Sequence, residues 1–399
     1  MSIELSPDQR TAHDAVMDWS KLRSPETKTL AGFAGCGKTP TAAAIARTMK
    51  AENKRLRIGH SCFTGKASLV LGGKLKAAGV LAEEDYCGTL HRLIYEPIVD
   101  KKTGRITGWK KKDRDDLPFD IFFLDEASMI SEDYYDDLRS YGKPILAVGD
   151  HGQLPPIHGK FNLMESPKLR LEKIHRQAEG SPIIRMSMLA RLEGHIPFGN
   201  YGPGVFKTKS RNLINQIKDP REGVVLCGTN RTRTEINSKM RAILGRRGAP
   251  VVGETVICLK NDHGAGVYNG MIGELVSIDD WCPYAGKVDI TGRLLCPRGC
   301  DYHYAGEVRF EKDDVTWQGP MLKEQFGAPK TFQEHPTLHY SRIHGLFDFG
   351  YCTTVHKAQG SERDNVVLVE ETGWMEEDLR RRWLYTGVTR AAKKLAMVA

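Results

Sequence analysis

The chain has 399 residues, of which 40% are hydrophobic and 27% charged, a length and balance typical of two or three globular domains. No apolar run approaches the length of a membrane span, and the N-terminus lacks the charged-then-apolar pattern of a secretion signal. We therefore expect no membrane contact and a cytoplasmic location.

The net charge of +8 favours contact with polyanions, although a merely basic surface would have the same balance. Nine cysteines, an odd number without a secretion signal, indicate reduced thiols. One group of residues could bind zinc, namely Cys282, Cys296, Cys300 and His303. The group lacks the usual Cys-x-x-Cys pair, so the sequence favours no metal there.

Near the N-terminus, Ser6 and Pro7 are typical of a helix start. A G-x-x-x-x-G-K-[ST] loop then runs from Gly32 to Thr39, between a short apolar strand and a helical segment. In such loops backbone N–H groups converge on phosphates, and the Lys38 and Thr39 side chains contact phosphate oxygens and Mg²⁺. ATP with Mg²⁺ is the cofactor that we expect, bound by Gly32, Gly35, Cys36, Gly37, Lys38, Thr39 and Pro40.

Apolar strands recur further along the chain, with helical segments between them, in two groups on either side of about residue 180. The strands are expected at 58–63, 121–124, 145–148, 224–227, 366–369 and 395–398. This alternation indicates an α/β fold with two sheets of buried parallel strands.

Two segments interrupt the alternation. Residues 97–112 form two β-prone arms around a Lys-Thr-Gly turn, which predicts a small hairpin inserted in the first sheet domain. Residues 253–344 contain short β-like pieces punctuated by Gly and Pro, which predict a β-barrel-like insertion in the second.

Two strand ends carry groups suited to phosphate chemistry. The strand before Asp125 and Glu126 ends in a carboxylate pair, of which Asp125 can anchor Mg²⁺ and Glu126 can deprotonate an attacking water. The next strand leads into Gly149-Asp-His-Gly-Gln-Leu-Pro-Pro156, where the Gln153 amide can contact the terminal phosphate. Each segment alone could be a polar turn.

Together these segments resemble the RecD/Dda-type branch (1B) of the superfamily 1 DNA helicases, in a layout similar to phage Dda-like enzymes. The matching positions run along almost the whole chain: Gln9, Gly32–Thr39, Thr64–Ala67, Thr89–His91, Asp125–Glu126, Gly149–Pro156, Arg176–Gln177, Val355–Glu362 and Leu384–Ala391. Phe63, where the family often has Pro, and Pro40 depart from the pattern.

The resemblance implies two RecA-like domains. Domain 1A would cover residues 1–178, with the hairpin insertion 1B at about 95–118. Domain 2A would combine 179–252 with 345–399, around an SH3-like insertion 2B at 253–344.

The resemblance also assigns site residues. Gln9 would bind the adenine, Gly360 and Glu362 would contribute to the nucleotide site, and Arg176 and Arg390 would act as arginine fingers on the terminal phosphate. Contacts to single-stranded nucleic acid are expected from Phe63, Thr64, Lys66, His91, Ile106, Trp109, Asn230, Thr354, His356 and Lys357. For any one of these, core packing or a solvated surface position is the alternative.

The predicted function is that of a monomeric, ATP-driven DNA helicase that moves along single-stranded DNA and separates duplex DNA. The family branch implies 5′→3′ polarity, single-stranded/duplex DNA junctions as substrates, and replication, recombination or repair proteins as partners. Two alternatives remain open: a nucleic-acid-stimulated ATPase switch that does not unwind, and an RNA helicase.

Overall fold

The computed structural model describes residues 4–22, 24–99, 106–156, 161–173, 180–210, 212, 223–281, 303–310, 315–322, 325–327 and 345–399. The chain divides into two compact units. Unit 1 comprises Met1–Ile196 and Met375–Thr389, and unit 2 comprises Pro197–Trp374 and Arg390–Ala399. The domain limits expected from the sequence stay predictions.

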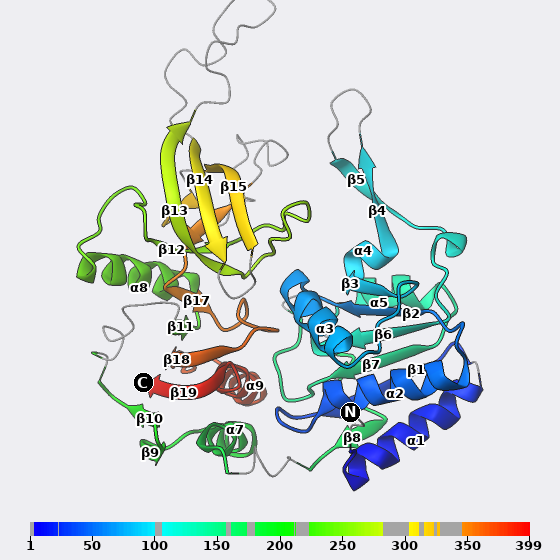
Figure 1. The fold of residues 1–399 in the computed structure, drawn as a ribbon. Helices are drawn as coiled ribbons and strands as arrows, with labels where there is room; N and C mark the ends of the chain where they lie inside the picture. The colour runs from blue at the N-terminus through cyan, green and yellow to red at the C-terminus, as the bar shows by residue number, and fades with distance from the viewer. Residues whose placement is uncertain are drawn as a thin grey trace, which may run out of the picture. The chain divides into compact units, whose positions relative to one another are not determined.

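Unit 1 is built on a parallel sheet of six strands in the order β3-β2-β6-β7-β1-β8 (Figure 1). The strands are β1 (Thr27–Gly32), β2 (Ile58–Cys62), β3 (Tyr86–Thr89), β6 (Ile121–Asp125), β7 (Ile145–Gly149) and β8 (Leu169–Leu171). Every residue of β2 and β7 is buried, as expected for parallel strands covered on both faces. The predicted parallel α/β architecture is therefore confirmed.

Helices cover both faces of this sheet. They are α1 (Pro7–Lys21), α2 (Lys38–Glu52), α3 (Gly65–Ala77), α4 (Leu90–Ile94) and α5 (Glu132–Arg139), with short 3₁₀ turns η1 (Arg114–Asp116) and η2 (Ala127–Met129). Unit 1 also contains α7 (Pro182–Glu193) and α9 (Glu377–Val388), which pack against each other. Alternate strand residues point to opposite faces: Phe123 packs in one cluster with α1, α2 and α3, whereas Phe122 packs in the other with α4 and α5.

Local sequence explains where these helices begin. Ser6 forms a capping box with Gln9 at the start of α1, and the Thr64 and Thr89 hydroxyls accept the Ala67 and Arg92 N–H groups at the starts of α3 and α4. These caps fix the turns that follow β2 and β3, where functional residues are expected.

His60 is a polar residue among the apolar side chains of β2. Its ring lies edge-on to Phe123 with the centroids 5.3 Å apart. Only 2% of the residue is exposed, and burial lowers the pKa of His60 to about 4, so the imidazole is neutral near pH 7.

The predicted hairpin is present as β4 (Tyr95–Val99) and β5 (Ile106–Lys111), an antiparallel pair that projects beyond α4 (Figure 1). Its base is tied to α5, because the Lys111 ammonium and the Tyr95 hydroxyl both donate to the Asp137 carboxylate. The hairpin therefore has a fixed base on unit 1.

Unit 2 contains a second six-stranded sheet in the order β17-β11-β18-β19-β10-β9, parallel except for β9. The elements are β9 (Gly199–Gly202), β10 (Val205–Thr208), β11 (Val224–Cys227), β17 (Cys352–Thr354), β18 (Arg363–Val369) and β19 (Ala391–Val398), with α8 (Asn230–Ile243). This is the second α/β sheet that the strand alternation predicted.

Unit 2 also contains a five-stranded antiparallel sheet in the order β15-β14-β13-β12-β16. Its strands are β12 (Thr255–Cys258), β13 (Ile272–Trp281), β14 (His303–Phe310), β15 (Val315–Leu322) and β16 (Phe347–Phe349). A bridge between Met321 of β15 and Gly345, just before β16, brings the two edge strands together. This partial closure around Trp317 and Phe347 agrees with the expected barrel-like insertion.

Of the helices in the described part of the chain, none combines the length and apolar character needed to cross a membrane.

Candidate functional site

The phosphate-loop sequence forms a turn between the end of β1 and the start of α2. Gly35 and Gly37 adopt left-handed backbone angles, with φ of 85° and 76°, which side-chain-bearing residues rarely adopt. A Cβ on Gly32 would lie 3.1 Å from the Leu171 Cβ and 3.2 Å from the Lys38 Cγ. The three glycines therefore allow a tight loop that ends at a helix N-terminus, where N–H groups have no partner within the helix.

Lys38 folds back over this loop. Its ammonium donates to the Gly32 and Phe33 carbonyl oxygens at 2.8 and 3.0 Å, and it lies 3.5 Å from Asp150 Oδ2. The position places one positive charge beside the backbone of the loop, where a phosphate group would need neutralisation.

Asp125 is the last residue of β6 and Glu126 follows it, at the same carboxyl edge of the sheet as the loop. Asp125 Oδ1 accepts the Glu126 N–H at 3.0 Å. Burial raises the pKa of Asp125, partly offset by this hydrogen bond and by the Lys38 charge. Glu126 has φ of 52°, and among the described residues it is the only non-glycine with positive φ. Such a backbone is costly and is found preferentially at functional sites.

The Gly149–Pro156 segment contributes a buried network. Asp150 Oδ1 accepts the Gly152 N–H at 3.0 Å, and Oδ2 accepts the Tyr385 hydroxyl at 2.7 Å. The Tyr385 oxygen in turn accepts the Ala34 N–H of the phosphate loop at 2.7 Å. Tyr385 of α9 therefore connects the phosphate loop to Asp150. Sequence reasoning did not assign this role to either residue.

Gln153 and Gln9 lie near this network and the loop respectively. Gln153 is 4% exposed, and its Oε1 has no hydrogen-bond partner among the residues described. The Gln9 side chain accepts the Ser6 N–H and donates to the Cys36 carbonyl at 3.0 Å, so the expected adenine-binding residue contacts the phosphate loop.

The donor set at this edge fits a nucleotide triphosphate with Mg²⁺. It combines a glycine cradle, a lysine, the Thr39 hydroxyl, the Asp125 carboxylate and the buried Gln153 amide, whose NH₂ group can donate to a phosphate oxygen. The phosphate loop precedes Asp125 by 86 residues and Gln153 by 114, and β1, β7 and β6 bring the three segments to one edge.

Five aromatic side chains, Phe63, His91, Tyr95, Trp109 and Tyr134, gather between β2, α4, α5 and the hairpin, and we call them the aromatic cluster. The His91 ring centroid lies 4.3 Å from that of Trp109 and 6.0 Å from that of Tyr134. Phe63 and Trp109 are 37% and 44% exposed. The structure thus brings three predicted nucleic-acid contacts together and adds Tyr95 and Tyr134, which sequence reasoning missed.

The polar residues of unit 1 that were predicted to contact nucleic acid differ in their hydrogen-bonding state and charge. The Thr64 hydroxyl is occupied by the cap of α3, and Lys66 is half-buried in the first turn of that helix. Burial lowers the pKa of His91, so this ring is neutral near pH 7 and does not bind phosphate through charge.

In unit 2 the candidates lie at the end of β17, in the segment that follows it, and at the start of α8. The Thr354 hydroxyl accepts the Lys357 N–H at 3.4 Å, and burial lowers the pKa values of His356 and Lys357. Asn230 begins α8, whose N-terminal side is held by the Glu371 carboxylate through the Gly228 N–H at 2.6 Å.

Arg390 lies beside the Gly360–Arg363 turn of the same unit. Its guanidinium donates to the Ser361 carbonyl at 3.2 Å, and its carbonyl accepts the Arg363 N–H at 2.8 Å. Gly360 has φ of 69°, and Glu362 is exposed. The structure therefore brings Arg390, Gly360 and Glu362 together within unit 2.

Several sequence-predicted positions lie outside the described residues: Arg176, Gln177, Cys282, Cys296 and Cys300, with the side chains of Ile106 and His303. Within the described ranges no group of three or more His, Cys, Asp or Glu side chains is arranged to hold a metal ion.

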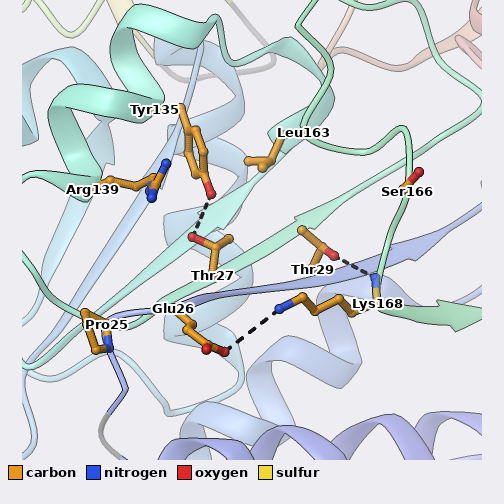
Figure 2. A pocket seen from close by; sticks show the side chains of 9 residues that line it. All are labelled: Pro25, Glu26, Thr27, Thr29, Tyr135, Arg139, Leu163, Ser166 and Lys168. Carbon is orange, nitrogen blue, oxygen red and sulfur yellow. Dashed lines mark hydrogen bonds and ion pairs between the residues drawn. The ribbon is translucent and has the colours of Figure 1, made fainter.

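A pocket of about 630 Å³ opens at the amino ends of the strands, away from the phosphate loop (Figure 2). Its polar groups largely pair with one another: the Tyr135 hydroxyl donates to Thr27 at 2.9 Å, and the Lys168 N–H donates to Thr29 at 2.8 Å (Figure 2). The Lys168 ammonium lies 3.9 Å from Glu26. We do not include this pocket in the candidate site.

The loop geometry and the sheet order define unit 1 as a P-loop nucleotide-binding domain. Comparison with known families agrees: the AAA domain family matches residues 4–226, more than half of the chain, and the UvrD-like helicase C-terminal domain matches residues 349–398. The chain belongs to the AAA domain family. Its likeness to the superfamily 1B RecD/Pif1-type helicases is supported by relatives named as RecD2 and PIF1 helicases.

Individual relatives are distant. The chain is 25% identical to the ATP-dependent RecD2 DNA helicase of Deinococcus radiodurans over 91% of its length, but spans only 45% of that protein. It is 32% identical over 38% of its length to the ATP-dependent DNA helicase PIF1 of Trypanosoma brucei brucei and spans 16% of it. The fold is similar to that of a Bacteroides Pif1 helicase solved with ADP-AlF3 and ssDNA, with a TM-score of 0.56, 17% identity, and coverage of 100% of this chain and 93% of that one.

The Tyr385 bridge leads to a testable prediction. In Tyr385→Phe the ring keeps its place beside Phe33, 5.9 Å away between centroids, but the Ala34 N–H loses its acceptor. We expect the Ala34 amide to exchange hydrogen roughly two- to tenfold faster, since one hydrogen bond contributes about 0.5–1.5 kcal/mol.

Hydrogen exchange resolved to single amides measures this effect. Tyr201→Phe is the control, because it removes a hydroxyl that donates to a backbone carbonyl of unit 2, that of Pro197. An unchanged Ala34 rate in Tyr385→Phe would contradict the bridge.

Proposed function

We propose that the chain is an ATP-hydrolysing DNA helicase that translocates on single-stranded DNA and separates duplex DNA with 5′→3′ polarity. The observation that carries the proposal is the convergence of Lys38, Asp125 and Glu126 at one sheet edge in a chain of the AAA domain family. The relatives named for ATP-dependent DNA helicase activity support the substrate class.

The proposed chemistry is hydrolysis of the terminal phosphate of ATP. Lys38 and the loop amides bind the phosphates, Glu126 takes the proton of the attacking water, and Gln153 contacts the terminal phosphate. Thr39 and Asp125 would hold Mg²⁺, which when bound offsets phosphate charge. Gln9 binds the adenine, Gly360 and Glu362 complete the nucleotide site, and Arg176 and Arg390 stabilise developing charge as arginine fingers.

We further propose that single-stranded DNA contacts unit 1 through the aromatic cluster together with Thr64 and Lys66. Exposed rings offer stacking surfaces to bases irrespective of sequence, and hydroxyls and cations hold the backbone phosphates. In unit 2, the contacts would come from Asn230, Thr354, His356 and Lys357. We propose that the protein acts as a monomer at single-stranded/duplex junctions in the cytoplasm, alongside replication or recombination proteins.

Strand displacement tests the function directly. We expect ATP-dependent displacement from a duplex with a 5′ single-stranded tail and little from one with a 3′ tail. Lys38→Ala and Glu126→Gln should each lower ATP turnover by roughly two or more orders of magnitude, because both stabilise the transition state of phosphoryl transfer. Glu126→Gln should retain nucleotide binding.

Near-parental ATP turnover in either variant would contradict the assignment of that residue to the ATPase site. DNA-stimulated turnover without displacement of either substrate would select the ATPase switch instead. Greater stimulation by single-stranded RNA than by DNA of equal length would select the RNA helicase.

The aromatic cluster gives a separate prediction. Trp109→Ala should weaken binding of oligo(dT) by roughly 5- to 100-fold, because stacking on one base contributes about 1–3 kcal/mol. Fluorescence anisotropy at one fixed salt concentration measures the affinity. Trp374→Ala is the matched control, since Trp374 is 66% exposed but lies outside the cluster. Equal affinities for the two variants would rule out stacking on Trp109.

Pro40 gives a prediction about nucleotide affinity. Gly37 caps α2, so Pro40 is the third helical residue and lacks one of the N–H groups that would otherwise face an anion. A charge-assisted hydrogen bond to the α-phosphate contributes about 1.5–3 kcal/mol. Pro40→Thr should therefore bind ATP roughly tenfold or more tightly, with a smaller effect on turnover at saturation.

Nucleotide titration of the two proteins measures the change. Pro182→Thr, at the first position of α7, is the control for replacing a helix-start proline elsewhere in unit 1. If Pro40→Thr and the parent bind ATP equally, this backbone position does not contact the nucleotide.

A further inference from the structure

Phe33 brings an aromatic ring into the phosphate loop at a position that phosphate binding leaves open. The G-x-x-x-x-G-K-[ST] pattern fixes two glycines, Lys38 and Thr39, whereas residue 33 can be of any type. The Phe33 carbonyl accepts the Lys38 ammonium at 3.0 Å and the Cys36 N–H at 3.2 Å, so its backbone is part of the loop structure. The pattern does not account for the ring.

A guanidinium group stacks on this ring. The Arg191 Cζ atom of α7 lies 3.5 Å from the Phe33 ring centroid, well within the range of about 6 Å over which a cation is attracted to the face of an aromatic ring. Arg191 Nε is buried and has no hydrogen-bond partner in the described part of the chain, so the ring compensates for part of its desolvation. The Arg381 guanidinium of α9 donates to the Arg191 carbonyl at 3.2 Å, which fixes α7 behind this contact.

Other neighbours of the ring belong to the turn that follows β7. The His151 ring centroid lies 4.0 Å from that of Phe33, and burial lowers the pKa of His151, so this imidazole is neutral near pH 7. A Cβ on Gly152 would lie 3.0 Å from Phe33 Cε1, closer than most side-chain carbons approach. Gln153, which is proposed to contact the terminal phosphate, follows directly. The Phe33 ring therefore connects the phosphate loop to the turn that carries Gln153.

We propose that Phe33 and Arg191 are positioning residues, which act as a pair to hold the Gln153 turn at a fixed distance from the phosphate loop. The stacked guanidinium keeps the ring against His151 and Gly152. The ring in turn keeps Gln153 within reach of the terminal phosphate of a nucleotide bound in the loop. The inference rests on the proposed ATPase site and deepens it, because it assigns the residues on which recognition of the terminal phosphate depends.

The pair should affect the binding of triphosphates more than that of diphosphates. The loop amides bind the phosphates that ATP and ADP share, whereas Gln153 acts on the terminal phosphate alone. A residue that merely stabilises the loop would affect both nucleotides equally. The ratio of the two dissociation constants therefore separates positioning of Gln153 from general support of the loop.

The test titrates ADP and the non-hydrolysable ATP analogue AMP-PNP, each with Mg²⁺, into the whole chain and its variants. We expect Phe33→Leu and Arg191→Leu each to weaken AMP-PNP binding about fivefold or more and ADP binding less than about twofold, because one hydrogen bond to a charged group is weakened. The double variant should lose no more than the larger single effect, since the two side chains act as one unit. Arg191→Lys keeps the cation and should recover part of the loss.

Arg139→Leu is the matched control. The Arg139 guanidinium lies 5.6 Å from the Tyr135 ring centroid, so the substitution removes the same kind of contact, but at the amino ends of the strands. It should leave both dissociation constants unchanged.

Unchanged AMP-PNP binding in Arg191→Leu, an equal loss of both nucleotides, losses that add in the double variant, or the same change in Arg139→Leu would overturn the inference. If Phe33→Leu does not fold, Arg191→Leu decides alone, because it leaves the ring in place. Gln153→Ala distinguishes the levels. If Gln153→Ala binds AMP-PNP as the parent does, the proposed contact to the terminal phosphate fails; if only the Phe33 and Arg191 variants do so, this inference alone fails.

Discussion

The parallel pairing of β6, β7 and β1 is the constraint on which the site depends. Parallel strands present their carboxyl ends at one sheet edge, so the turn after Gly32, the carboxylate pair after Leu124 and the segment after Gly149 meet without direct pairing between them. Full burial of β7 makes its register costly to change, because a one-residue slip would turn its side chains to the wrong faces. The packed core of unit 1 therefore fixes the relative positions of these three segments.

Side chains of α9 also position the segment that follows β7. Its Tyr385 hydroxyl bonds to Asp150, the Thr386 hydroxyl accepts the Leu154 N–H at 3.0 Å, and the Arg382 guanidinium donates to the His151 carbonyl at 2.7 Å. Three side chains of one helix therefore fix the turn after β7. Since Tyr385 also accepts the Ala34 N–H, the same helix restrains the phosphate loop.

Much of this arrangement could be predicted from sequence, because local rules determine it. The loop needs glycine where φ is positive, and buried parallel strands need apolar runs, so Gly35, Gly37 and the strand before Asp125 could be recognised from pattern alone. Contacts made by pairing distant segments could not. Tyr134 and Tyr95 carry no local signal for joining His91, and the partners of Tyr385 lie some 235 and 351 residues away. The edge-on contact of the buried His60 ring with Phe123 could not be predicted either, because it depends on the register between β2 and β6.

In unit 2, buried ion pairs fix the helix next to the candidate DNA contacts. Arg233 of α8 pairs with Asp348 of β16, and Arg241 pairs with Glu254 at 2.8 Å just before β12. Removing one partner of such a pair would leave an uncompensated buried charge, which costs about 3–5 kcal/mol. The pairs therefore fix α8 against the strands of the five-stranded sheet. Asn237 of the same helix accepts the Cys352 N–H at 2.8 Å, which ties α8 to β17 as well. Because the Thr354–Lys357 segment follows β17 directly, the placement of these candidate DNA contacts depends on the ion pairs of a helix that precedes them by more than 100 residues.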